Sequence, residues 1–506
     1  MKRKGIKSLL LVFVLTTLAI ALSACSGDKK GDNSSQITIG IRQDVEDSLD
    51  PHKTVAAGTK EVLFNLFEGL VKPDSDGSFI PAVASAYEES EGGKVYTFTL
   101  REGVKFHDGS LVTAEDVKFS LDKCADTSKG DPLVAAFSNI ESVEITDEKT
   151  VVVTLKEADT EFLAYMTTAI IPASNANPDS NPIGTGPYKF VSRSPQENFI
   201  MEKFDEYWGE PAYIENVTFK VCSNADAIVM DLEGGSIDMF PRVTATQAAE
   251  LSNEFNVLEG TMNLVQALYL NNAVEPFNDV KVRQALCYAI DVEEIMLMVS
   301  DGKGTELGSS MFPAFGKYYM PELNDTYNTD IEKAKALLAE AGYADGFSFT
   351  ISVPSNYQPH VDTAQVLVEQ FKKIGVNAEI QLIEWDSWVS DVYQGREFQS
   401  TVVGIDASNI TGASLLQRFT SEAPKNFINY QNPAYDEAFN NAITSTDDAE
   451  KTKYYQECQR ILSEDAANVY IQDLPEFVAL NKKYTGYEFY PLYVQDVAKI
   501  RFAENK

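Results

Sequence analysis

The sequence of 506 residues is short of histidine, cysteine and positive charge. It contains three histidines (His52, His107 and His360) and five scattered cysteines, so a metal site built from these residue types is not expected. Lysine and arginine number 42 against 76 aspartates and glutamates, which gives a net charge of −34. Because phosphate backbones repel a chain of this charge, the composition argues against a nucleic-acid-binding protein.

Beyond the first 25 residues, the sequence has no apolar run long enough to cross a membrane. Apolar residues make up 44% of the chain and aromatic residues 11%, so the chain can bury a large core and is not disordered. A chain of 506 residues is longer than a domain with a single hydrophobic core usually is, so two or three lobes are expected.

The N-terminus has the pattern of an export signal. Four basic residues precede an almost wholly apolar segment, residues 9–22, which is too short to span a bilayer comfortably. Small residues then lead to Cys25, an arrangement similar to the lipobox of bacterial lipoproteins. The resemblance implies that residues 1–24 are removed and that Cys25 carries a lipid anchor at the extracytoplasmic face of the cell membrane; an ordinary signal peptide is the alternative. Residues 25–35 are small and polar, which is typical of a flexible tether.

The other four cysteines are far apart in the sequence. Export permits disulfides, but Cys287 and Cys458 lie in apolar helical patterns, and free cysteine packs well as a small apolar residue. We therefore expect buried free thiols at Cys124, Cys222, Cys287 and Cys458.

Strand and helix patterns alternate along the rest of the chain. Thr113 with Asp116 three residues later forms a capping box, which predicts the start of a helix. A strand over 347–353, a helix over 364–374 and a strand over 376–382 predict a βαβ unit and hence a parallel pair of strands. The other expected elements are a hairpin over 96–106, a strand pair over 143–155 and a helix over 330–341. The predicted fold class is α/β with at least two lobes.

Five groups of residues together resemble one family. They lie at 96–117, at 182–188, at 206–211 with 235–238, at 276–291 and at 334–343. In this order and spacing they are similar to the solute-binding lipoproteins of ABC importers in the oligopeptide, dipeptide and nickel class, which is family 5 of the bacterial extracellular solute-binding proteins. The resemblance covers about 400 residues.

The resemblance implies a fold like that of periplasmic binding proteins, with two hinged lobes, mixed sheets (type II) and an inserted smaller domain. The implied boundaries are 36–70, 184–272 and 479–506 for the first lobe, 71–183 for the inserted domain and 273–478 for the second lobe. Two motifs that suggest chemistry then have structural interpretations. His107-Asp108-Gly109 is a turn signal rather than a catalytic pair. Gly184-Thr185-Gly186 is not a phosphate loop, because Lys189 stands where a third glycine is required.

A site for short peptides needs charged partners for the termini and aromatic walls for the side chains. The resemblance places Trp385 where many peptide-binding members have a tryptophan that faces the ligand; an ordinary core aromatic is the alternative. It also implies ligand contacts from four further residues: Tyr269, Asn271, His52 and Phe67. No metal ligand set and no cofactor are expected, although a nickel chelate needs few direct ligands.

The partner of the ligand's ammonium group departs from the family pattern. The relatives that bind peptides have the motif Gly-Trp-x-x-Asp. When this chain is aligned from Gly404, Ile405 takes the position of the tryptophan and Ser408 that of the aspartate. The nearest acidic residue is Asp406, two positions before Ser408. Residues two positions apart in a strand point to the same face, so the Asp406 side chain can point to the side on which relatives have their aspartate. We expect Asp406 to bind the ammonium, assisted by Ser408 or Asn409.

The resemblance implies a non-catalytic receptor that captures short peptides and delivers them to a membrane permease and its ATPase. The protein is expected to act as a monomer. The alternatives are a receptor for a metal chelate or sugar, and a sensory peptide-binding protein. An exported hydrolase is disfavoured because neither G-x-S-x-G nor H-E-x-x-H occurs, and a single S-x-x-K (Ser300 to Lys303) lacks its partner motifs.

Overall fold

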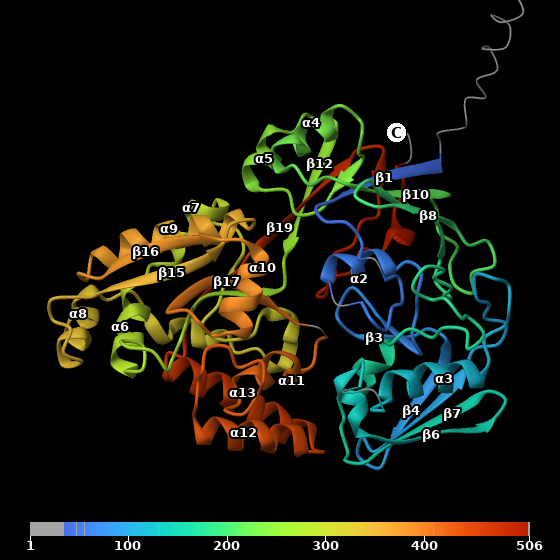
Figure 1. Cartoon of the computed structure of the whole chain (residues 1–506), viewed down its shortest axis with the longest axis horizontal. Coiled ribbons are helices and arrows are strands. Elements are labelled where there is room, and N and C mark those ends of the chain that lie inside the picture. Colours follow the sequence, from blue (N-terminus) through green and yellow to red (C-terminus); the bar gives the residue numbers. More distant parts are fainter. Residues whose placement is uncertain are drawn as a thin grey trace, which may run out of the picture.

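The computed structural model describes residues 35–46, 48–54, 56–128, 130, 132–407 and 409–503 (Figure 1). Cys25 and the export signal lie outside the described residues. Helices and strands alternate along the described chain, which confirms the α/β class. In this part of the chain no helix has the length and apolarity needed to cross a bilayer.

A seven-stranded sheet forms the core of the first lobe, in the order β12-β19-β11-β1-β10-β9-β8. Strand β1 (Gln36–Ile41) pairs in parallel with β10 (Asn216–Val221) on one side and β11 (Met239–Phe240) on the other. The remaining strands are β8 (Tyr188–Ser194), β9 (Asn198–Lys203), β12 (Phe255–Thr261) and β19 (Pro475–Asn481). This lobe is therefore assembled from the beginning, the middle and the end of the chain.

A six-stranded sheet forms the core of the second lobe, in the order β14-β18-β13-β17-β15-β16. Strand β15 (Ser348–Pro354), helix α9 (Gln358–Lys372) and strand β16 (Asn377–Ile383) follow one another, and the two strands are parallel. The predicted βαβ unit is thus confirmed. Strand β17 (Ser400–Asp406) is also parallel to β15. The other strands are β13 (Leu264–Leu270), β14 (Thr305–Glu306) and β18 (Asn468–Asp473).

Two short, neighbouring segments connect these sheets. Met262 and Asn263 lie between β12 and β13, and Leu474 alone lies between β18 and β19. The Met262 amide donates to the Leu474 carbonyl at 2.9 Å, so the two crossings run side by side, and Figure 1 shows β12 and β19 together between the lobes. Asn263 has a φ of 56°, in the left-handed region. So few connecting residues are typical of lobes that move about a hinge.

A four-stranded sheet in the order β4-β5-β7-β6 forms a third unit, at the lower right of Figure 1. Its strands are β4 (Ala84–Ser90), β5 (Val95–Leu100), β6 (Ile140–Asp147) and β7 (Thr150–Leu155), and helix α3 (Ala114–Ala125) packs beside them. The capping box of Thr113 and Asp116 at the start of α3 is present, as predicted.

The expected hairpin over 96–106 is wrong. Strand β5 pairs with β4 and β7, whereas the segment after its turn has a single bridge, between Lys105 and Leu111. The physical reason is that β4 and β7 already occupy both edges of β5, while Val104 and Phe106 are buried.

One further predicted helix is present, and other α-helices complete the lobes. Helix α8 begins after the N-cap Asp330, close to the expected start. The remaining helices are α2 (Ala57–Leu63), α4 (Ile228–Glu233), α5 (Ala245–Glu250), α6 (Val280–Ala289), α7 (Val292–Ser300), α10 (Trp385–Ser387), α11 (Gly412–Leu416), α12 (Pro433–Thr444) and α13 (Asp448–Glu464). The short strands β2 (Val71–Pro73), β3 (Phe79–Pro81), β20 (Tyr484–Thr485) and β21 (Arg501–Phe502) form two further pairs. Cys124, Cys222, Cys287 and Cys458 are free and buried, as expected.

The glycine-rich motif serves close packing between segments. A Cβ atom added to Gly184 would lie 2.1 Å from the Leu66 carbonyl oxygen, which is sterically impossible without movement. The motif lies against His107, whose Nδ1 accepts from the Gly184 amide at 3.2 Å while its Nε2 donates to the Gly186 carbonyl at 3.1 Å. Burial lowers the pKa of His107 to about 4, so its ring is neutral at pH 7. Both motifs are therefore structural.

Candidate functional site

Several polar and aromatic side chains follow the carboxyl ends of parallel strands. In the first lobe, Arg42 follows β1 and Arg242 follows β11. In the second lobe, Tyr357 follows β15, Trp385 follows β16 and Asp406 ends β17. Ligands of α/β sheets bind outside the carboxyl ends of the strands. We therefore treat these five residues, together with Tyr493, as one candidate site and call it the interlobe site.

Charged residues of each lobe act on a tyrosine of the other lobe. Burial raises the pKa of the Tyr357 hydroxyl, while Arg242 and Arg42 of the first lobe lower it and Asp406 raises it. Conversely, the pKa of Tyr493 is raised by burial, lowered by Arg242 and raised by Asp406 of the second lobe. Each lobe thus places charges close enough to act on a residue of the other.

Arg242 carries a positive charge that its own lobe neutralises. Its guanidinium forms ion pairs with Glu61 on α2 and, at 3.5 Å, with Glu476 on β19, and it lies 4.7 Å from the centre of the Tyr493 ring. Burial alone would lower the pKa of Arg242, but the two carboxylates hold it well above its ordinary value. Burial raises the pKa of Glu476 to about 7, although Arg242 opposes this rise.

Arg42 is different, because no carboxylate of the described residues forms an ion pair with it. Its Nη2 donates to the Arg242 carbonyl oxygen at 3.0 Å, and its guanidinium lies 5.4 Å from the centre of the Phe240 ring. Burial and the neighbouring Arg242 charge lower its pKa. The side chain is exposed, so the first lobe presents an uncompensated cation at this place.

The second lobe presents an aromatic surface. The Tyr357 ring meets Trp385 edge-on with 5.3 Å between ring centres, and Trp385 stacks on Trp388 at 5.1 Å. The Trp388 indole nitrogen donates to the Thr401 hydroxyl at 2.9 Å, which fixes the stack against β17. Tyr357 remains 37% exposed, so this surface can receive apolar groups of a ligand.

Asp406 is partly exposed at the end of β17, opposite Leu264 in the register of the sheet. In the described part of the chain its carboxylate accepts no hydrogen bond and forms no ion pair. Ser408 lies outside the described residues. Asn409 is described, and its side-chain oxygen accepts from the Thr411 hydroxyl at 2.7 Å. The second lobe therefore presents an anion beside its aromatic surface.

Tyr269 lies on β13, which pairs with β17, and Asn271 directly follows β13. In the antiparallel pair of β13 and β17, Leu264 is opposite Asp406 and Tyr269 is opposite Thr401, five residues further along. The Tyr269 hydroxyl donates to the Val265 carbonyl at 2.8 Å, and the Asn271 amide donates to the Phe398 carbonyl at 2.9 Å. Burial raises the pKa of Tyr269, and the Asp406 charge adds to this rise, so Tyr269 is close enough to feel the charge at the end of β17. The Asn271 side chain instead contacts the backbone at Arg396 and Phe398.

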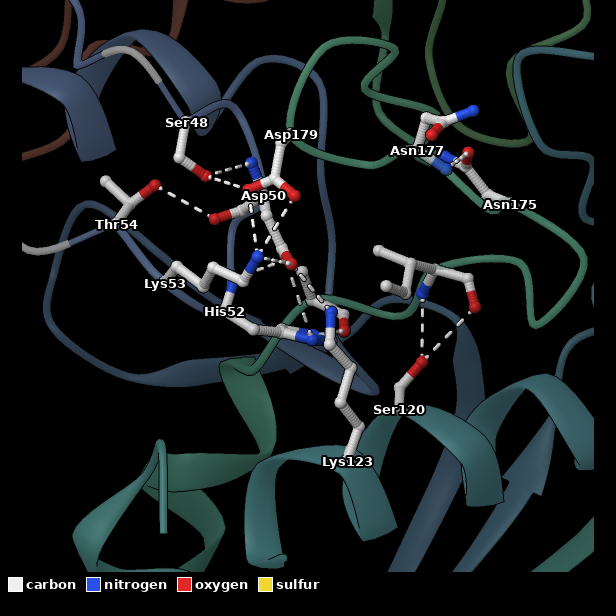
Figure 2. Close-up of polar contacts among 12 residues, drawn as sticks. Ser48, Asp50, His52, Lys53, Thr54, Ser120, Lys123, Asn175, Asn177 and Asp179 are labelled. Carbon is white, nitrogen blue, oxygen red and sulfur yellow. Dashed lines mark hydrogen bonds and ion pairs between the residues drawn. The ribbon is translucent and has the colours of Figure 1, made fainter. Parts of the chain in front are cut away.

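His52 belongs to a polar cluster between the first lobe and the inserted unit, shown in Figure 2. Its Nε2 donates to the Ala169 carbonyl at 2.7 Å, and burial lowers its pKa to about 4, so the ring is neutral at pH 7. Beside it, the buried Asp50 carboxylate accepts from Lys123 Nζ at 2.8 Å. Phe67 is buried in the first lobe's core. The described ranges contain no group of three or more potential metal ligands.

Arg42, Arg242, Tyr357 and Tyr493 were not predicted from the sequence. A signal existed for Tyr357, which closely follows the predicted strand over 347–353. Strand β11, which precedes Arg242, has only two residues and no detectable periodicity. These residues become candidates only through the arrangement of the strands.

Comparisons with known proteins agree with this architecture. The family model "Bacterial extracellular solute-binding proteins, family 5 Middle" matches residues 78–427. The chain is 30% identical to the oligopeptide-binding protein AppA of Bacillus subtilis (strain 168) and 27% identical to the dipeptide-binding protein of Escherichia coli (strain K12), with 97% of each chain covered in both cases. It also resembles the solved structure of DppA from Helicobacter pylori in complex with the peptide STSA, at a TM-score of 0.79 and 25% identity, over 92% of this chain and 98% of that one. The expected type II fold of periplasmic binding proteins is thus confirmed.

Proposed function

This chain belongs to family 5 of the bacterial extracellular solute-binding proteins, and from this membership we propose that it captures short peptides between its lobes. It hands them to the permease of an ABC importer, which works with an ATPase. The protein acts as a monomer, it is not an enzyme, and a lipid on Cys25 holds it at the outer face of the cell membrane. None of the six residues of the interlobe site is a serine, cysteine or histidine, which accords with a receptor rather than a hydrolase.

Asp406 carries the proposal for a peptide ligand. A peptide's ammonium group needs a carboxylate when it leaves water, and Asp406 offers one without a partner in the described chain. Tyr357 and Trp385 beside it supply apolar surface for side chains. Two relatives are named for binding oligopeptides and dipeptides, and a third was solved with a peptide, which supports the same ligand class. Asp406 takes the role that relatives give to an aspartate two positions later.

Closure of the lobes couples binding to transport. A ligand that contacts both halves of the interlobe site stabilises the arrangement in which they approach, because a ligand shifts an equilibrium toward the state that it binds better. The permease then recognises the closed form. The two short crossings at 262–263 and at 474 allow this movement, and we propose them as the lobe boundaries in place of 272 and 478.

The proposal is tested by mass spectrometry of ligands released from purified protein. Residues 26–506, an anchor-free chain, are produced in wild-type form, as Asp406→Asn and as the control Asp345→Asn, which changes an exposed aspartate elsewhere in the second lobe. Wild type and control should release short peptides. Asp406→Asn should retain at least 10-fold less, since losing one partner of a buried charge pair typically costs ~3–5 kcal/mol. Absence of peptide from wild type, or equal retention by Asp406→Asn, contradicts the proposal.

A further inference from the structure

Two arginines stand side by side in the interlobe site, and only one is neutralised. Arg242 is paired with Glu61 and Glu476, whereas Arg42 has no carboxylate partner among the described residues. Arg42 therefore keeps a charge that no described side chain neutralises, and this charge is available to an anionic group of a ligand.

The backbone and ring contacts of Arg42 orient its guanidinium but use little of its binding capacity. Arginine has five N–H donors in a planar fork, and Arg42 gives one bond, from Nη2, to the Arg242 carbonyl oxygen at 3.0 Å. The Phe240 ring lies beneath the guanidinium at 5.4 Å. Phe240 is itself held against β1, because Gly40 leaves no room for even a Cβ atom between them. The remaining donors can form the paired hydrogen bonds that a carboxylate accepts.

The two unpaired charges have opposite signs and belong to opposite lobes. Arg42 follows β1 of the first sheet, and Asp406 ends β17 of the second. Both act on the same side chain, Tyr357, which closely follows β15. A ligand that satisfies both charges carries an ammonium at one end and a carboxylate at the other, which describes a short peptide with two free termini.

We propose that Arg42 binds the terminal carboxylate of the peptide and thereby selects peptides with a free C-terminus. This inference rests on the proposed function, in which Asp406 holds the amino end. The bound peptide then bridges the lobes through its two termini, with its side chains along Tyr357 and Trp385. Arg42 is therefore a specificity residue, and Arg242 positions it through its carbonyl oxygen.

The test compares two synthetic pools of dipeptides and tripeptides, identical in sequence, one with free carboxyl termini and one with C-terminal amides. Each pool is added to ligand-free protein, and the retained peptides are quantified by mass spectrometry. The variants are Arg42→Gln, the charge-preserving Arg42→Lys and the control Arg460→Gln, which changes an arginine paired with Glu457 on α13, outside the interlobe site.

Wild type and Arg460→Gln should retain the free-acid pool about 10-fold better than the amide pool or more, because an amide carries no charge to pair with Arg42. Arg42→Gln should lose this preference while retaining amides as well as wild type does, which also shows that it folds. Arg42→Lys should recover part of the preference.

Equal retention of both pools by wild type overturns the role of Arg42 and leaves the proposed function intact. If Arg42→Gln keeps the full preference for the free-acid pool, the role of Arg42 is likewise overturned and the proposed function stays intact. Retention of neither pool by wild type overturns the peptide ligand and, with it, this inference.

Discussion

The hydroxyl of Tyr455 donates to the carboxylate of Glu161 at 2.7 Å, although 294 residues separate them in the chain. The same carboxylate accepts from the Gly412 amide at 2.8 Å. Glu161 belongs to the inserted unit, whereas Gly412 begins α11 and Tyr455 lies on α13 of the second lobe. In Figure 1 these helices lie beside the inserted unit, away from the crossings between the sheets. Glu161 therefore links the inserted unit to the second lobe, at a place separate from the two crossings at 262–263 and 474.

Tyr455→Phe should shift the protein toward an open form. The substitution removes one hydrogen bond to a charged group, worth ~1.5–3 kcal/mol, while the ring still packs against Tyr318 and Phe439. Small-angle X-ray scattering of the ligand-free variant should show a larger radius of gyration, and peptide affinity should fall. Tyr454→Phe is the control and should leave both unchanged. An unaltered radius and affinity in Tyr455→Phe would show that the contact does not hold the lobes together.

Asp473→Asn should remove a dependence of stability on pH. Asp473 precedes the crossing at Leu474, and its Oδ1 accepts from the Leu264 amide at 3.1 Å, a bond that asparagine can keep. Burial raises its pKa to about 7. Between an unfolded pKa of ~3.9 and this value, only the folded form binds the proton, so stability falls as pH rises through this range.

The Asp473→Asn variant should therefore match wild type at pH 4 and be more stable at pH 8, by up to roughly 4 kcal/mol for a shift of about three pKa units. Denaturant unfolding at both pH values measures this difference. The exposed Asp448→Asn serves as control and should show no such gain. A gain that is the same at both pH values would rule out titration of Asp473 as the cause.

Glu68→Ala should destabilise the protein strongly. The buried Glu68 carboxylate accepts from the Tyr207 hydroxyl at 2.7 Å, from the Trp208 indole at 2.6 Å and from Lys72 at 3.0 Å. Removal leaves these donors unpaired, and breaking a buried charge pair costs ~3–5 kcal/mol. Denaturant unfolding measures the loss. Glu206→Ala, which breaks an exposed pair with Lys105, should cost no more than ~1 kcal/mol; equal losses would refute the structural role of Glu68.

Cys25→Ser should release the protein from the membrane. Radiolabelled palmitate should label the wild-type protein in cells, and the variant should lose both the label and its sedimentation with membranes. Cys25 precedes β1, the first strand of the first lobe, by 11 residues in the sequence, so peptide binding should be unaffected. Continued membrane retention of the variant would contradict a lipid anchor at this cysteine.

The family, the α/β class and the elements with strong local signals could be predicted from the residues alone. The βαβ unit over 348–383 was predictable because apolar alternation and helical periodicity are properties of contiguous residues. The capping box of Thr113 and Asp116 was predictable for the same reason. Asp406 was predicted because it stands near the position at which the family resemblance places an aspartate, and its role stays a prediction.

The residues that share the interlobe site could be recognised only in the folded chain. Arg42 and Arg242 are 200 residues apart, and they become neighbours because β1 and β11 pair in parallel. The partners of β5 were decided in the same way, since a turn signal does not say which strand edge is free. Whether a charge is neutralised depends on its surroundings in space, and for this reason the contrast between Arg42 and Arg242 appears only in the folded chain.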